Sequence, residues 1–338
     1  VKLFAFLCVA LAALVYLRQP EIDQLPDLLR PPRATPGSGL DFAASTLVSA
    51  CAILCLPRQF HALVVEARGS RDASLARWLM ITYLLLFMVL AVPISLAGSR
   101  LAAELGASSV SPDSYVQWFP AAREQGWLVL VAFIGGISAA TSMVIVGTVS
   151  LAIMLTNEIA VPLMLRGRSS GGPALFALGN RLRTVRQVTI ALVLFAAWLV
   201  SGRLEDIPWL TEIGFMSFLA ASQLAPGLVA GLYWRRAHGA AVMAGIVAGL
   251  ACWAYGMVLP AMLEADHALL TDGPLGMELL RPNALLGWES ATLLGPATVV
   301  SLGLNTALLV VLSLLLRPSS ADLRQAALYL DTSRAGPD

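Results

Sequence analysis

Residues 127–149 have the sequence WLVLVAFIGGISAATSMVIVGTV, which contains no charged side chain. A helix of about 20 apolar residues is long enough to span the hydrocarbon core of a bilayer. Seven further apolar stretches, bounded by charged residues, Pro or Gly, lie at 1–17, 41–64, 77–97, 187–202, 210–234, 239–263 and 294–316. The pattern predicts an all-α polytopic membrane protein, with about eight helices over residues 1–316.

The composition excludes a water-soluble globular fold. Of the 338 residues, 58% are hydrophobic and 13% are charged, and the mean hydropathy is +0.77. Soluble domains carry about 25% charged residues, so this chain has too few polar side chains to cover its surface. The apolar–polar alternation of a transmembrane β-barrel is missing as well. The net charge of +1 gives no reason to expect a nucleic-acid partner.

We expect neither a metal site nor catalytic residues in this chain. Its cysteines, Cys8, Cys51, Cys55 and Cys252, all lie in apolar stretches. The Cys51–Cys55 pair lacks the His or acidic company that a metal site needs. No nucleophile–base pair or phosphate-binding glycine loop is present in the sequence.

The distribution of arginine predicts which loops face the cytoplasm, because cytoplasmic loops carry an excess of Lys and Arg. Arginines gather at 65–77, at 165–186, at 235–238 and after residue 316, whereas the loop at 264–291 is acidic. Every second loop is therefore basic. We expect the C-terminal segment to lie in the cytoplasm.

Polar groups inside a membrane span often mark a pathway, and the first such group follows Pro57. Arg58, Gln59 and His61 come directly after this proline. Pro57 has no N–H and interrupts a helix, and a broken helix can form a solute site near the bilayer midplane. The alternative is that the span ends at Pro57 and the polar side chains lie among the lipid headgroups.

The second polar group consists of Ser138, Thr141 and Ser142. Their spacing of three and four residues places the three hydroxyls on one face of a helix. Hydroxyl oxygens suit a hard cation such as Na⁺. The alternative is helix packing, because small hydroxyl residues let helices approach and hydrogen-bond.

The third polar group centres on Gln223, which precedes Pro226 in the span 210–234. Gln223 either lines a cavity or hydrogen-bonds a neighbouring helix, and Asn305 in the last span has the same two interpretations. The spaced glycine pairs Gly227 with Gly231 and Gly245 with Gly249 indicate close helix contact.

The chain resembles the sodium:solute symporter family in three stretches. QLAPGLVAGLYWRR at 223–236 resembles the late helices of that family, and LPRQFH at 56–61 resembles its Gly-Gln-Pro-His break. Residues 138–158 resemble its sodium-site helix. The resemblance covers essentially the whole chain and implies a partial LeuT-type helical bundle, made of family helices six to thirteen and incomplete at its N-terminus.

Several short stretches of the sequence resemble one subgroup, the symporter-like input domains of CbrA-type sensor histidine kinases. These stretches are CLPRQFH at 55–61, FIGGISAAT at 133–141, and RPS at 317–319 with QAA at 325–327. This resemblance implies the membrane part of a sensor histidine kinase in the bacterial inner membrane, with residues 317–338 starting a linker to signalling domains. ATP and the phosphorylated His would belong to domains beyond this chain, and a response regulator would be the partner.

The resemblance also implies a solute, either an amino acid or a short carboxylate, that is bound or transported. The candidate solute-binding residues are Pro57, Gln59, His61 and Gln223. An alternative function is a stand-alone symporter coupled to sodium or protons, and a third is a structural membrane subunit with a degenerate site.

The candidate cation-binding residues are Ser138, Thr141 and Ser142. Counting back from Thr156 places Ser142 and Met143 at the family's pair of adjacent hydroxyl residues, so one hydroxyl is missing. Coupling to Na⁺, coupling to H⁺ and uncoupled sensing all remain open.

Overall fold

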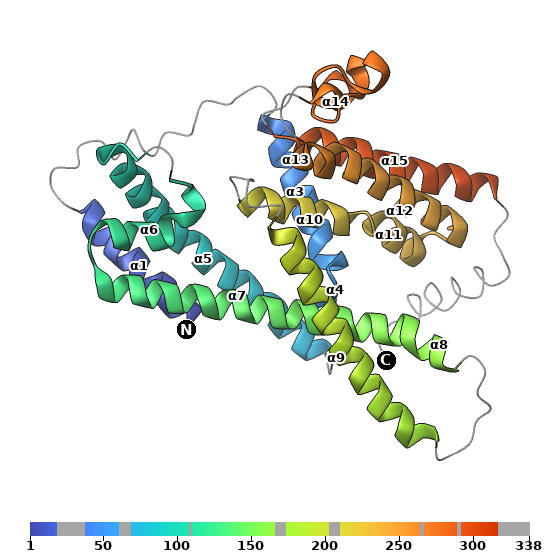
Figure 1. Cartoon of the computed structure of the whole chain (residues 1–338), viewed down its shortest axis with the longest axis horizontal. Helices are drawn as coiled ribbons and strands as arrows, with labels where there is room; N and C mark the ends of the chain where they lie inside the picture. The colour runs from blue at the N-terminus through green and yellow to red at the C-terminus, as the bar shows by residue number, and fades with distance from the viewer. Residues whose placement is uncertain are drawn as a thin grey trace. The chain divides into compact units, whose positions relative to one another are not determined.

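The computed structural model describes residues 1–18, 38–60, 69–107, 110–165, 174–202, 210–263, 267–288 and 292–316, and every regular element in these ranges is helical. The chain divides into two compact units, Val1–Pro32 with Phe60–Trp209 and Arg33–Gln59 with Leu210–Asp338. Figure 1 gives the helix labels used below. The predicted all-α fold class is confirmed.

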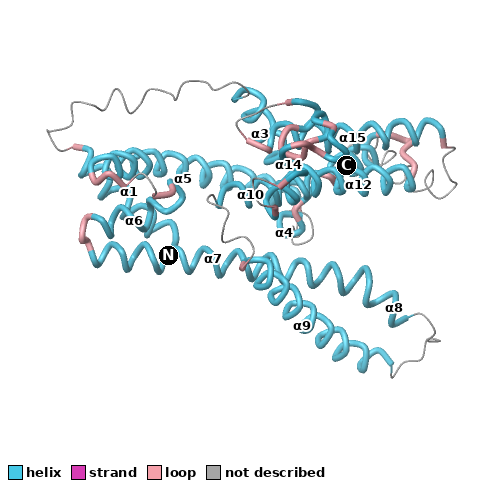
Figure 2. The backbone as a smooth tube through the Cα atoms, turned by 45° about the horizontal axis from the view of Figure 1, so that its top comes forward, coloured by secondary structure: helices cyan, strands magenta, loops and turns pink. Residues whose placement is uncertain are grey.

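The first unit contains α1 (Lys2–Leu17), α5 (Ser70–Glu104), α6 (Tyr115–Ala122), α7 (Gly126–Leu155), α8 (Val161–Leu165) and α9 (Ala174–Ser201). Helix α1 packs against both α5 and α7, and the short α6 contacts the same two helices. Figure 2 shows α1 and α6 close to α5. A π-helical turn at Thr156–Ala160 joins α7 to α8.

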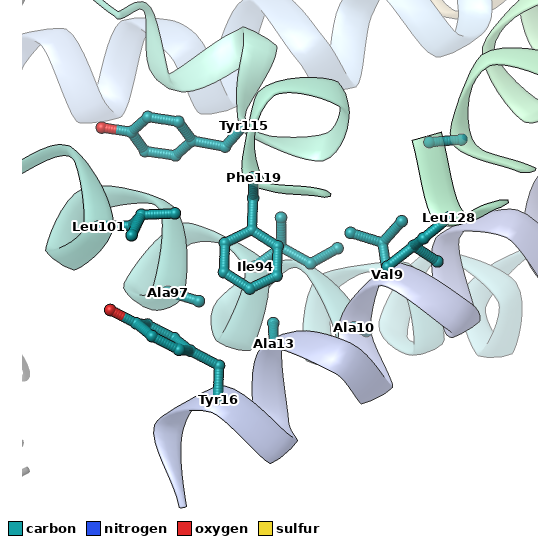
Figure 3. Packing of buried hydrophobic residues seen from close by; sticks show 11 residues of the cluster. Val9, Ala10, Ala13, Tyr16, Ile94, Ala97, Leu101, Tyr115, Phe119 and Leu128 are labelled. Carbon is teal, nitrogen blue, oxygen red and sulfur yellow. The ribbon is translucent and has the colours of Figure 1, made fainter. Parts of the chain in front are cut away.

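A cluster of buried apolar side chains holds α1, α5, α6 and α7 together (Figure 3). Its members are Val9, Ala10, Ala13, Tyr16, Ile94, Ala97, Leu101, Tyr115, Phe119, Leu128 and Ala132. The ring of Phe119 meets the edge of the Tyr16 ring, with the ring centroids 5.6 Å apart. The alanines of α1 leave the space that these larger rings fill, as close packing requires.

The second unit contains α3 (Ser38–Cys55), α10 (Leu210–Ser222), α11 (Ala225–Tyr233), α12 (Gly239–Trp253), α13 (Leu259–Met262), α14 (Ala268–Thr271) and α15 (Leu294–Leu315). The four-residue α4 (Pro57–Phe60) lies where the two units divide. Helices α12 and α15 pack along each other, and α3 packs against α10 and α15. The apolar core of this unit consists of Ala44, Val48, Leu219, Met257, Leu294 and Ala297.

Six helical segments in the described ranges are long and apolar enough to cross a membrane. They are Ser74–Glu104, Gly126–Met164, Leu182–Ser201, Thr211–Tyr233, Gly239–Met262 and Leu294–Leu315, and two shorter apolar helices are Lys2–Leu17 and Gly39–Cys55. Many of their large apolar side chains are exposed, such as Trp198 at 68%. These exposed side chains match a lipid environment, so the chain is a multi-pass membrane protein.

The helices extend beyond several predicted ends. The span predicted at 77–97 is part of a helix over Ser70–Glu104, and the one predicted at 187–202 begins at Ala174. Apolar runs end at the first charged residue, but a helix backbone continues through charged positions because its hydrogen bonds do not depend on side-chain polarity. The apolar length therefore underestimated these two helices.

The close contact of α1 with α7 gives a testable prediction. A methyl group at Gly135 would overlap the methyl group of Ala5, whereas one at Gly147, on the same helix, would meet no atom within 4 Å. We expect Gly135→Ala to lower the free energy of unfolding by about 1–3 kcal/mol, the usual cost of overpacking. Gly147→Ala is the matched control and should be neutral or stabilising, because Ala favours a helix more than Gly does.

Thermal unfolding of the purified protein in a neutral detergent measures both variants. Equal unfolding temperatures for Gly135→Ala and Gly147→Ala would contradict the observed packing of α1 on α7.

Candidate functional site

The span predicted as one helix at 210–234 is in fact broken at Gln223. Helix α10 ends at Ser222, and α11 begins at Ala225. Pro226 lacks the N–H that would otherwise bond the carbonyl of Ser222, and its ring is crowded by that carbonyl. The N–H groups of Gln223 and Leu224 instead form tight turns, to the carbonyls three residues back, at 3.2 and 3.1 Å.

Gln223 is fully buried, and its polar groups are bonded to α15. Its Nε2 donates to Oγ of Ser301 at 3.0 Å, and its Oε1 accepts from Nδ2 of Asn305 at 3.1 Å. The same Nδ2 donates to the backbone carbonyl of Gln223 at 2.7 Å. Asn305 therefore supplies the hydrogen bond that this carbonyl loses at the break.

These partners belong to a row of buried polar residues on α15, which we call the polar seam. The polar seam consists of Thr298, Ser301, Asn305 and Ser313. Spacings of three, four and eight residues keep all four on one face of the helix. At its far end, Oγ of Ser313 accepts from the backbone N–H of His238, just before α12, at 3.2 Å.

Glycines let α12 approach the polar seam. A methyl group at Gly249 would overlap Oε1 of Gln223, and one at Gly245 would lie 2.6 Å from Oδ1 of Asn305. The predicted role in helix contact is therefore confirmed for Gly245 and Gly249. Asn305 and Gln223 fit beside α12 only because these two positions carry no side chain. In the other predicted pair, a methyl group at Gly227 would overlap Val242, whereas one at Gly231 would meet no atom within 4 Å.

Two polar atoms in the polar seam are buried, Oγ1 of Thr298 and Oδ1 of Asn305. Neither has a hydrogen-bond partner among the described residues. Buried polar groups are normally paired. An amide oxygen accepts hydrogen bonds, and a hydroxyl both donates and accepts. The seam therefore contains two unsatisfied polar atoms, of which Oδ1 of Asn305 lies against Gly245 of α12.

Helix α3 is interrupted where the sequence predicts it. It ends at Cys55, and α4 starts at Pro57. The side chains of Arg58 and Gln59 are half-buried, and His61 lies outside the described residues. The assignment of Pro57, Gln59 and His61 to solute binding stays a prediction.

A hydrogen bond ties α3 to the end of α10 near the break. Oγ of Ser222 donates to the carbonyl of Val48 at 3.2 Å and to the carbonyl of Phe218 at 2.7 Å. This contact holds the last residue of α10 against α3.

The three candidate cation ligands lie on α7, in the first unit, whereas Gln59 and Gln223 belong to the second. Thr141 and Ser142 are exposed and Ser138 is half-buried. In the part of the chain that the structure describes, none of the three has a side-chain hydrogen bond, so their oxygens are available to a ligand. Their role in cation binding stays a prediction.

Of the two interpretations that the sequence left open for Gln223 and Asn305, the structure shows hydrogen bonds to a neighbouring helix. Sequence reasoning did not single out Thr298, Ser301 and Ser313. The signal was present, because polar residues at 298, 301 and 305 follow a helical spacing inside an apolar span. Ser and Thr are common in membrane helices and often bond their own backbone, so this pattern alone does not distinguish a site. Within the described ranges, no group of three or more His, Cys, Asp or Glu residues could hold a metal ion.

An 80-residue stretch of the chain is 36% identical to an uncharacterised symporter of Cupriavidus necator. The match covers 24% of this chain and 11% of that protein, so the chain spans only a small part of this relative. No family model matches the chain, and no solved structure matches it. The apolar helices and this partial likeness fit a symporter-like membrane protein.

The polar seam gives a prediction with a matched pair of variants on one helix face. Ser301→Ala removes the acceptor for the buried Nε2 of Gln223, so we expect the free energy of unfolding to fall by about 1–2 kcal/mol. Thr298→Val keeps the side-chain shape and removes a hydroxyl without a partner, so it should be neutral or stabilising.

Chemical or thermal unfolding in detergent compares these two variants with the unmodified protein. The assignment of Ser301 as a partner of Gln223 would be wrong if Thr298→Val cost as much stability as Ser301→Ala.

Proposed function

We propose that this chain is the membrane domain of a symporter-like protein that binds or carries a small polar solute. The observation that carries the proposal is the helix break at Gln223, closed by Asn305 of α15. Secondary transporters build their solute sites from discontinuous helices near the bilayer midplane. The partial likeness to a protein named as a symporter supports the same class.

The solute is an amino acid or a short carboxylate, the classes that the family resemblance implies. An ammonium group could donate to Oγ1 of Thr298, a hydroxyl without a partner among the described residues. The guanidinium of Arg58, close to Gln59, has the fork geometry that suits a carboxylate. We therefore add Thr298 and Arg58 to the predicted solute-binding residues, which are Pro57, Gln59, His61 and Gln223.

The coupling ion is Na⁺ or H⁺. Its proposed ligands are the hydroxyl groups of Ser142, Thr141 and Ser138. Their unbonded hydroxyls on one helix face support this assignment. A hard cation takes oxygen ligands of this kind.

The finer part of the proposal is coupling to two-component signalling. The resemblance at 55–61, 133–141 and 317–327 supports a sensor histidine kinase of the bacterial inner membrane, with a cytoplasmic C-terminus and a response regulator as partner. The alternative is a stand-alone symporter. Sequencing the gene beyond codon 338 separates them, because the kinase requires a phospho-accepting His region and an ATP-binding domain.

Transport and ion coupling are tested on the full-length protein in proteoliposomes. Uptake of radiolabelled proline, histidine and acetate is measured under sodium and proton gradients. We expect one solute to be taken up, and Ser142→Ala to reduce the stimulation by the ion gradient about tenfold. Ser217→Ala is the control, because Ser217 is also an exposed serine in a span but bonds its own helix at the carbonyl of Ile213.

Absence of uptake and of equilibrium binding for all three solutes would contradict a solute-handling function. Uptake that responds equally in Ser142→Ala and Ser217→Ala would remove Ser142 from the ion site and leave the transport proposal standing.

A further inference from the structure

A second group of polar side chains lies in the first unit, where α1, α5 and α6 end. Tyr16 is near the end of α1, Arg100 and Glu104 are in the last turns of α5, and Arg123 directly follows α6. The hydroxyl of Tyr16 donates to Oε2 of Glu104 at 2.8 Å, and Nε of Arg100 donates to Oε1 at 2.7 Å. Glu104 therefore already has a donor on each of its oxygens.

The charges in this group do not balance. The guanidinium groups of Arg123 and Arg100 lie over the ring of Tyr16, at 5.0 and 5.9 Å from its centroid. Among the residues that the structure describes, Glu104 is the one carboxylate bonded to the group, and both Arg100 and Arg123 act on its charge. One positive charge is left over, held against an aromatic ring at 6% exposure.

One hydrogen-bond donor in this group also lacks an acceptor. Nη1 of Arg100 is buried and has no hydrogen-bond partner among the residues that the structure describes. The C-terminal end of a helix attracts cations through the helix dipole, which accounts for Arg123 directly after α6. The dipole does not explain a buried guanidinium N–H without an acceptor, which is costly.

We propose that this end of the first unit binds a single oxyanion, a phosphate or carboxylate group that accepts from Nη1 of Arg100 and neutralises the excess charge with Arg123. The planar guanidinium fork matches two oxygens of such a group. The oxyanion comes either from the phosphate of a lipid headgroup or from a free phosphate or carboxylate. The site is separate from the polar seam of the second unit, so it stands independently of the proposed function.

The test uses the purified full-length protein in micelles of a maltoside detergent, which contains no phosphate, with the unfolding temperature as the readout. One arm adds sodium phosphate, with sodium chloride at equal ionic strength as the reference. The other arm adds phosphatidylglycerol to the same micelles, and native mass spectrometry counts the retained lipid. We expect phosphate, phosphatidylglycerol or both to raise the unfolding temperature.

Arg123→Gln should weaken the apparent affinity about tenfold, because it removes one of the two guanidinium groups beside Tyr16. Arg100→Lys is the second variant, because it keeps the charge beside Glu104 but removes Nη1, and it should weaken binding similarly. Arg18→Gln is the matched control. Arg18 is exposed and lies at the same end of α1, and its substitution removes the same charge. The Arg18→Gln variant should bind phosphate or lipid with unchanged affinity.

A response to phosphatidylglycerol alone identifies a lipid phosphate, and a response to free phosphate identifies a soluble oxyanion. Both outcomes support the site. The proposal is overturned if neither probe stabilises the protein more than chloride does, or if Arg18→Gln weakens binding as much as Arg123→Gln.

Discussion

A helix that breaks inside a bilayer exposes backbone groups that lipid cannot hydrogen-bond, and the second unit of this protein is arranged around one such break. Pro226 has no N–H to donate to the carbonyl of Ser222, so α10 cannot continue as a regular helix. At the break, Nδ2 of Asn305 donates to the carbonyl of Gln223 at 2.7 Å and bonds the side chain of Gln223 as well. One asparagine on α15 therefore stabilises both the backbone and the side chain at the break.

The contact between Gln223 and Asn305 restricts which residues can lie next to it on the surrounding helices. Helix α12 packs against the Gln223–Asn305 pair, and glycine at 245 and 249 leaves the space that the two side chains occupy. Ser301 accepts from the Gln223 amide, and Ser222 bonds the end of α10 to α3. The break is thus packed and hydrogen-bonded from three helices, α3, α12 and α15.

Apolar length predicted the all-α polytopic class, because burial in lipid requires about 20 apolar residues regardless of tertiary structure. Of the eight predicted stretches, six correspond to helices long enough to cross a membrane in the described ranges, and the first two correspond to shorter apolar helices. The interruption at Pro57 was also predictable, since proline acts locally. The break at Gln223 was missed although Pro226 stands in the sequence. The span is apolar on both sides of it, and only the contact with Asn305, 82 residues away, shows how the break is stabilised. Long-range polar pairs of this kind, including that of Tyr16 with Glu104, carry no local signal.

The central claim is that Gln223 and Asn305 stabilise the break jointly, and a double-mutant cycle tests it most directly. Gln223→Leu, Asn305→Leu and the double variant are unfolded in the same detergent, and the interaction energy is taken from the three changes in stability. The account predicts a favourable coupling of about 1 kcal/mol, within the range known for hydrogen bonds between membrane helices. Changes that add within about 0.3 kcal/mol would show that the two residues act independently, and would contradict the account.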